Sequence, residues 1–219
     1  MPDLYYWTID YEIEHLSDFH VGDGTILLGG NLHGLRMDEN GFPYMPHTQV
    51  RGLLKKAALQ LAGWQIFLGP LIERNFPSNR KNSQKIPWWS YTRAGYCRDY
   101  INRDSMGYQS HILKRSDKDP LLFSYQKAGS SQYSLSNWQG TVYSVEPASE
   151  IDVAFMIMCM RADDRIGARR SRGYGKVQWK VDRINRFKPG DETLDQVEKD
   201  LGGWVDVLFS SDTEILQDN

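Results

Sequence analysis

Large apolar and polar side chains nearly alternate from residue 7 to residue 13, which predicts a strand with one buried face. Further strands are expected at residues 34–37, 141–145, 151–160 and 176–184. The run at 151–160 is apolar almost throughout, so we expect it to lie at the centre of a sheet.

Residues 49–61 have the spacing of an amphipathic helix, because their apolar side chains recur three and four positions apart. Thr48 is expected to cap the start of this helix, and Gly63 is expected to end it. The last segment, residues 191–219, is expected to hold a helix and a final strand or tail.

The middle of the chain, residues 74–139, shows no helical period and mixes prolines and small polar residues with many aromatic ones. We interpret it as an irregular insertion with short strands and long loops. The order of the other elements predicts an α+β fold with an antiparallel or mixed sheet. A single domain is expected, with its core at about 4–73 and 140–190 and an acidic extension at 191–219.

Charge is distributed unevenly along a chain whose formal net charge is only −2. Residues 47–58 and 165–180 contain cations and no acid, whereas the segment after Gly190 is strongly acidic. This distribution suits a protein that binds a polyanion on one face, although ordinary solvated charge gives the same count.

Two cysteines, Cys97 and Cys159, have no Cys or His neighbour at metal-ligand spacing, so neither a zinc site nor a cofactor is expected. No apolar run is long enough to cross a bilayer, and no membrane partner is expected. The first residues carry an early acid and no basic stretch, which argues against a signal peptide and favours a cytoplasmic location.

The segment at 167–176 reads Gly-Ala-Arg-Arg-Ser-Arg-Gly-Tyr-Gly-Lys. Its glycines permit backbone angles closed to other residues and let amides approach a phosphate, and its guanidinium groups can each grip a phosphate through two bonds. A glycine turn with solvated arginines is the alternative. The predicted phosphate-binding residues here are Gly167, Arg169, Arg170, Ser171, Arg172, Gly173, Tyr174 and Lys176.

A second anion site is predicted where the helix starts near Thr48, because free amides and the positive end of the helix dipole lie there. Thr48 and Gln49 belong to this helix start, and Arg51 and Lys55 would extend the site along one helical face. Ordinary surface charge is the alternative for the two cations.

Three motifs occur in a fixed order: His-Val-Gly-Asp-Gly at 20–24, Arg-Met-Asp-Glu-Asn-Gly-Phe-Pro-Tyr-Met-Pro at 36–46 entering the helix, and the glycine-arginine segment at 165–177. Together with Gly-Thr-Val-Tyr-Ser-Val-Glu at 140–146, they resemble the RAMP superfamily of CRISPR proteins, particularly the backbone subunits of type III effector complexes. The resemblance covers about residues 7–66 and 140–184.

The resemblance implies a ferredoxin-like (RRM-like) βαββαβ core, with the insertion in the place of the thumb hairpin that such subunits lay across a guide–target duplex. It also implies that the partners are CRISPR RNA, target RNA and other effector subunits. Within the insertion, Trp88, Trp89 and Trp138 are candidates to stack on bases or to pack against a neighbouring subunit.

The sequence departs from the family pattern where subunits that cut target RNA carry an aspartate. Gly29-Gly30 is followed by Asn31, Leu32 and His33, and no carboxylate stands there. We therefore expect a subunit that binds RNA but cuts it poorly or not at all.

Two alternatives remain open at this point. One is an endoribonuclease that cuts target RNA, or processes CRISPR RNA, through Asp23, His33 or His20, with a divalent metal only in that case. The other is an assembly protein that never touches RNA.

Overall fold

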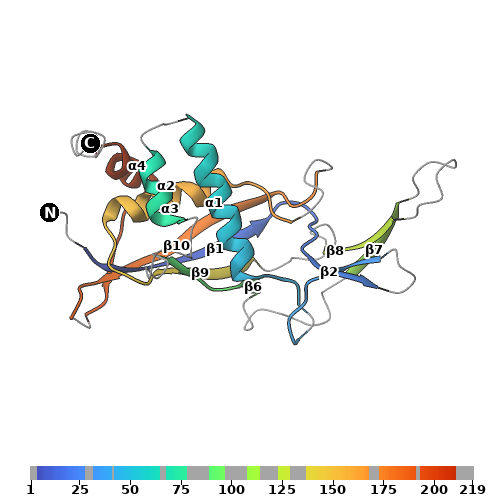
Figure 1. The fold of residues 1–219 in the computed structure, drawn as a ribbon. Helices are drawn as coiled ribbons and strands as arrows, with labels where there is room; N and C mark the ends of the chain where they lie inside the picture. Colours follow the sequence, from blue (N-terminus) through green and yellow to red (C-terminus); the bar gives the residue numbers. More distant parts are fainter. Residues whose placement is uncertain are drawn as a thin grey trace.

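The computed structural model describes residues 4–27, 32–40, 42–64, 68–77, 89–96, 108–113, 123–128, 137–167, 173–190 and 193–210. These residues form an antiparallel main sheet covered by helices on one face, together with a smaller second sheet (Figure 1). The prediction of an α+β fold is confirmed.

The main sheet is ordered β11-β10-β1-β9-β6-β4, with β5 also paired to β9. All of its strand pairs are antiparallel. Its strands are β1 (Tyr6–His15), β4 (Tyr44–Met45), β5 (Trp89–Tyr91), β6 (Ala94–Tyr96), β9 (Trp138–Ser144), β10 (Val177–Phe187) and β11 (Asp195–Gln196).

The central strand β1 alternates strictly between half-buried and buried residues, as its sequence predicts. Its neighbour β10 does not alternate strictly, because a bulge places Asp182 opposite no residue of β1. Trp179 and Ile184 are five positions apart, yet both are buried. The bulge accounts for this, since a regular strand would turn them to opposite faces.

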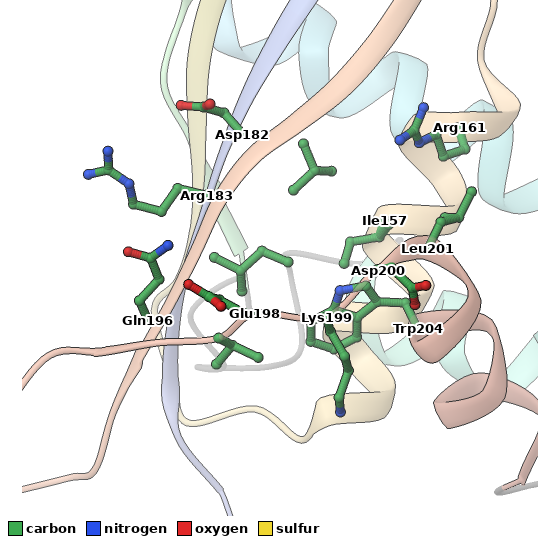
Figure 2. A pocket seen from close by; sticks show the side chains of 13 residues that line it. Ile157, Arg161, Asp182, Arg183, Gln196, Glu198, Lys199, Asp200, Leu201 and Trp204 are labelled. Atoms are coloured by element: carbon green, nitrogen blue, oxygen red, sulfur yellow. The ribbon is translucent and has the colours of Figure 1, made fainter.

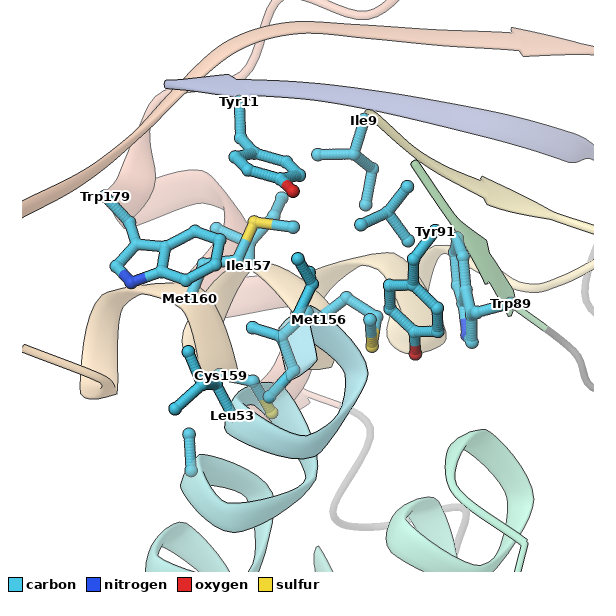
Figure 3. Packing of buried hydrophobic residues seen from close by; sticks show 14 of the residues in the cluster. Ile9, Tyr11, Leu53, Trp89, Tyr91, Met156, Ile157, Cys159, Met160 and Trp179 are labelled. Carbon is cyan, nitrogen blue, oxygen red and sulfur yellow. The ribbon is translucent and has the colours of Figure 1, made fainter. Parts of the chain in front are cut away.

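Within the described ranges, the helices that cover one face of the main sheet (Figure 1) are α1 (His47–Trp64), α2 (Gly69–Asn75), α3 (Glu150–Ala162) and α4 (Leu201–Ser210). Figure 3 shows side chains of β1, β5 and β10, such as Tyr11, Tyr91 and Trp179, pointing toward α3 and α1. The main hydrophobic core therefore lies between the sheet and these helices.

The helix expected at 49–61 is confirmed, but the predicted cap is wrong. The Val50 amide donates to the Pro46 carbonyl at 3.1 Å, so the helix starts at His47 and Thr48 lies inside its first turn. Gly63 also lies within the helix, which ends at Trp64.

The strand expected at 151–160 is wrong, because these residues belong to α3. Ser149 and Asp152 form a capping box at its start, which favours a helix. Most of α3 is buried, from Asp152 through Met160, since it lies between the sheet and the neighbouring helices α1 and α4. A helix buried on nearly all sides shows no polar face in its sequence.

The region interpreted as an insertion contributes to both sheets. Its β5 and β6 belong to the main sheet, whereas β7 (Tyr108–Leu113) and β8 (Phe123–Ala128) form a hairpin in the second sheet. The second sheet also contains β2 (Gly22–Leu27) and β3 (Leu32–Leu35), in the order β2-β3-β8-β7. It extends beyond one end of the main sheet (Figure 1).

The late elements also differ in part from expectation. The strand expected at 176–184 is confirmed as β10, and the one at 141–145 lies within β9 apart from its last residue. The last segment holds β11 followed by α4. Among the described residues, no helix is both long and apolar enough to cross a membrane.

Candidate nucleic-acid interface

Backbone contacts bring the three sequence motifs together at the end of β1. Gly167 packs against the carbonyl of His20. The next residue, Val21, accepts a hydrogen bond of 2.7 Å from the Arg36 amide, and the Arg36 carbonyl accepts one of 3.2 Å from Tyr44, just before α1. The glycine segment, the first motif and the approach to the helix therefore lie next to one another.

Three hydrogen bonds tie the glycine segment to the turn that follows β1, and a fourth joins the two ends of the segment to each other. The Gly175 amide donates to the Asp18 carbonyl at 2.7 Å, and the Lys176 amide donates to Ser17 Oγ at 2.8 Å. The Leu16 amide donates to the Lys176 carbonyl at 2.9 Å, and the Ile166 amide donates to the Gly175 carbonyl at 2.8 Å. Both ends of the segment are thus held by the main sheet and its adjoining turn.

Three glycines of this segment have the left-handed backbone conformation that favours glycine: Gly167 at φ 70°, Gly173 at 85° and Gly175 at 72°. A Cβ on Gly167 would overlap the His20 carbonyl, and one on Gly175 would overlap the Ile166 carbonyl, whereas Gly173 faces open space. The conformational role predicted for Gly173 and Gly175 is confirmed.

The predicted phosphate-binding side chains Arg169, Arg170, Ser171 and Arg172 lie outside the described residues. In the sequence they lie between Gly167, which packs against the His20 carbonyl, and Gly175, which is anchored on Ile166 and Asp18. Of the described neighbours, Lys176 is exposed and Tyr174 is half-buried. The structure therefore places the attachment points of the basic segment at the end of β1.

Arg36 is a candidate cation that the sequence reasoning did not assign to RNA. Its backbone lies at the junction of the three motifs, and its Nε atom is buried with no hydrogen-bond acceptor among the described residues. An anion that reached this atom would supply the missing acceptor. The only sequence signal was the position of Arg36 at the start of the second motif.

The start of α1 is exposed at His47 and Thr48, with Gln49 half-buried. Of the two cations predicted to extend this site, Arg51 instead donates to the Pro77 carbonyl at 3.3 Å, next to the end of α2. Lys55 is half-buried on the same helix. The helix start adjoins the junction of the motifs through Tyr44, but Arg51 is held by a contact within the protein.

The face of the main sheet that the helices leave open carries fixed negative charge. Asp10, Glu12 and Glu14 follow one another on the half-buried side of β1. Glu14 Oε2 lies 2.7 Å from Lys180 Nζ, and this hydrogen-bonded carboxylate raises the pKa of Lys180. Lys180 and Arg183 of β10 offset part of this charge but give the face no excess of cations. The cationic segment at the end of β1 is therefore the better surface for phosphates.

Two tryptophans expected to contact a duplex lie in the core instead. Trp89 is 2% exposed and donates from its indole nitrogen to Asn75 Oδ1. Trp138 is fully buried, with its ring centroid 4.8 Å from that of Phe19. The prediction that these two stack on bases is wrong, because their alternation within strands turns them toward the helices. Trp88 lies outside the described residues.

The three candidate catalytic residues lie in the first motif and the strand after it. His20 is buried, with 6% of its surface exposed, and its ring lies against Gly22. Asp23 and His33 belong to the paired strands β2 and β3, and their side chains lie outside the described part of the structure. Among described residues, no group of three or more His, Cys, Asp or Glu side chains could hold a metal ion.

No protein-family model matches this chain, and no curated protein matches it.

Proposed function

We propose that this chain is an RNA-binding structural subunit of a type III CRISPR effector complex. It holds CRISPR RNA and its duplex with target RNA through backbone phosphates, and base pairing reads the sequence. The observation that carries the proposal is the convergence of three sequence motifs at the end of β1, where Gly167 and Gly175 anchor the arginine-rich segment against the protein backbone.

The order of elements supports a ferredoxin-like core within this proposal. The chain runs β1, α1, β5 and β6, β9, α3 and β10. The corresponding sheet order is β10-β1-β9-β6, with every pair antiparallel. A βαββαβ chain with its first and third strands at the centre has this arrangement. The β7–β8 hairpin then takes the position of the thumb.

The charge distribution supports phosphate binding at one end of the sheet. The segment at 165–177 contains Arg165, three arginines between Gly167 and Gly173, and Lys176, and it contains no acid. The open sheet face beside it is acidic along β1. A polyanion would therefore lie along the glycine segment and the start of α1 rather than across the sheet.

A holding role fits the candidate catalytic groups better than a cutting role. His20 is buried beneath the glycine segment, so it is poorly placed to exchange protons with a substrate. The position after Gly29-Gly30 carries an amide, Asn31, in place of a carboxylate.

The test is the affinity of the full chain for a fluorescent single-stranded RNA and for an RNA duplex, measured by anisotropy at two salt concentrations. Arg169→Glu/Arg170→Glu is expected to weaken binding to each of the two RNAs at least about tenfold. It should also reduce the steepness of the negative slope of log K against log salt by about 1 to 2. The loss should not depend on RNA sequence, since phosphates carry no sequence information.

A matched control is Arg161→Glu/Arg183→Glu, which makes the same charge change at two exposed residues outside the glycine segment. This control is expected to retain most of the affinity. Equal losses in the two double variants, or an affinity of the unmodified chain that does not fall with salt, would overturn the phosphate-binding proposal. Cleavage of a labelled complementary RNA by the chain in its assembled complex would overturn the non-catalytic part alone.

A further inference from the structure

A cavity of about 520 Å³ lies beside the outer edge of β10, away from the glycine segment. Figure 2 shows Ile157 and Arg161 of α3 and Trp204 of α4 on one side of it, and Asp182 and Arg183 of β10 on the other. This volume is in the range of sites that bind a small ligand or a few side chains.

The edge of β10 next to this cavity is open. Among the described residues, β11 pairs with β10 only at Asn185 and Arg186, and the Val197 amide donates to the Ile184 carbonyl at 2.8 Å. The chain then turns away toward α4, and no described strand pairs with residues 178–183 on that side. An open edge carries backbone donors and acceptors that can pair with an added strand.

A buried donor at the same place has no acceptor. Trp204 is 2% exposed, and its indole Nε1 atom has no hydrogen-bond partner within the described parts of the chain. In Figure 2 this nitrogen lies on the edge of the ring nearest Ile157, which lines the cavity. A buried N–H without an acceptor costs free energy, and a carbonyl of a bound molecule would supply the missing bond.

The rim of the cavity carries charges of both signs. Arg161 and Arg183 are exposed and make no ion pair, and Asp182 and Glu198 are likewise exposed and unpaired within the described structure. The carboxylates would repel RNA phosphates, whereas a peptide with both signs of charge can complement the rim.

We propose that this edge and cavity form a docking site for an extended segment of a partner protein. The segment adds a strand beside residues 178–183 of β10, continuing the line of β11. One of its aliphatic side chains fills the cavity between Ile157 and Leu201, and one of its carbonyls accepts the Trp204 indole N–H. This site is separate from the glycine segment, and it does not depend on the proposed RNA binding.

The experiment uses a fluorescein-labelled peptide, acetyl-Glu-Thr-Val-Leu-Val-Thr-Lys-amide, with the full chain. Binding with a dissociation constant below about 1 mM is expected. A peptide N-methylated at alternate residues, and one with Asn in place of the central Leu, are each expected to bind at least about tenfold more weakly, because they lack the strand pairing or the apolar side chain. In a ¹H–¹⁵N spectrum the Trp204 indole signal, assigned with Trp204→Phe, is expected to shift when the peptide binds.

Leu201→Trp places a larger side chain in the cavity and is expected to weaken peptide binding at least about tenfold. Leu201 is 41% exposed, so the variant should still fold. Leu59→Trp, at a leucine that is 55% exposed on α1, is the matched control and should bind as the unmodified chain does. The proposal is overturned by no binding at 1 mM peptide, by equal binding of the N-methylated peptide, by an unmoved Trp204 signal, or by displacement of the peptide by an RNA oligonucleotide.

Discussion

Asp152 Oδ2 lies 2.6 Å from Arg74 Nη2, and the Asp152 carboxylate is fully buried. The same carboxylate accepts from Asn75 at 3.0 Å and from the Ser149 amide at 3.0 Å. Asn75 in turn accepts from the indole of Trp89. One side chain at the start of α3 therefore joins α2, α3 and β5 at the edge of the core.

Asp152→Ala is expected to lower the free energy of unfolding by about 3 kcal/mol, because it leaves the buried donors of Asn75 and Ser149 without an acceptor. Urea denaturation measures the change. Asp206→Ala, at an exposed acid on α4, is the control and should change stability by less than about 0.5 kcal/mol. A loss below about 1 kcal/mol for Asp152→Ala would show that the network contributes little.

Gly175→Ala and Gly173→Ala form a matched pair within the glycine segment. Both residues have a positive φ, but only at Gly175 would the added Cβ overlap a carbonyl, that of Ile166. We expect Gly173→Ala to cost about 1 kcal/mol, from backbone strain alone, and Gly175→Ala to cost at least twice that.

The same two variants test whether the backbone conformation of the segment affects RNA affinity. Gly175→Ala is expected to lower RNA affinity more than Gly173→Ala, since it displaces the anchor on Ile166 and Asp18. Thermal denaturation and anisotropy measure the two effects. Indistinguishable variants would contradict the role assigned to this close approach.

His15 makes folding stability depend on pH. Its ring stacks on Phe19 at 4.4 Å, and burial lowers its pKa from the ordinary 6.5 to about 3. Between these values the unfolded chain binds a proton that the folded chain does not, so the unfolding free energy falls as pH falls. The stability is fully present above pH 6.5 and is lost toward pH 3, by up to about 1.4 kcal/mol for each pH unit.

His15→Phe is expected to remove this part of the acid dependence while keeping an aromatic ring against Phe19. The measurement is urea denaturation at several values between pH 7 and pH 4. His47→Phe, at an exposed histidine that starts α1, is the control and should keep the slope of the unmodified chain. Equal slopes in His15→Phe and the unmodified chain would contradict the assignment.

The half-buried strand and the amphipathic helix were predictable because each has one face in the core and one in water. In β1 the buried side chains alternate with half-buried ones, and in α1 the apolar side chains form a stripe, so each sequence shows which side faces the core. The glycines at 173 and 175 were also predictable, since few residues other than glycine adopt a positive φ.

The strand assignment of α3 failed for the opposite reason. An element buried on nearly every side has no polar stripe, and its run of eight apolar residues at 153–160 fits a central strand equally well. The Ser-x-x-Asp pattern at Ser149 and Asp152 was the missed signal, because it marks a helix start.

The tryptophan assignments failed because residue type alone does not say which face of a sheet a side chain occupies. Trp89 and Trp138 lie on adjacent strands that the sequence reasoning placed in a surface insertion, and both turn inward. The pairing of β5 and β6 with β9 joins distant parts of the chain, and no local pattern indicates it.

The bulge at Asp182 limits how β10 can change in length during evolution. Val177 and Trp179 before it and Ile184 after it all face the helices, although their positions differ in parity. Deleting Asp182, or inserting one residue elsewhere in the strand, would move the side chains of one half of β10 to the opposite face of the sheet. Substitutions can accumulate along this strand, but natural variants should gain or lose residues there only in pairs.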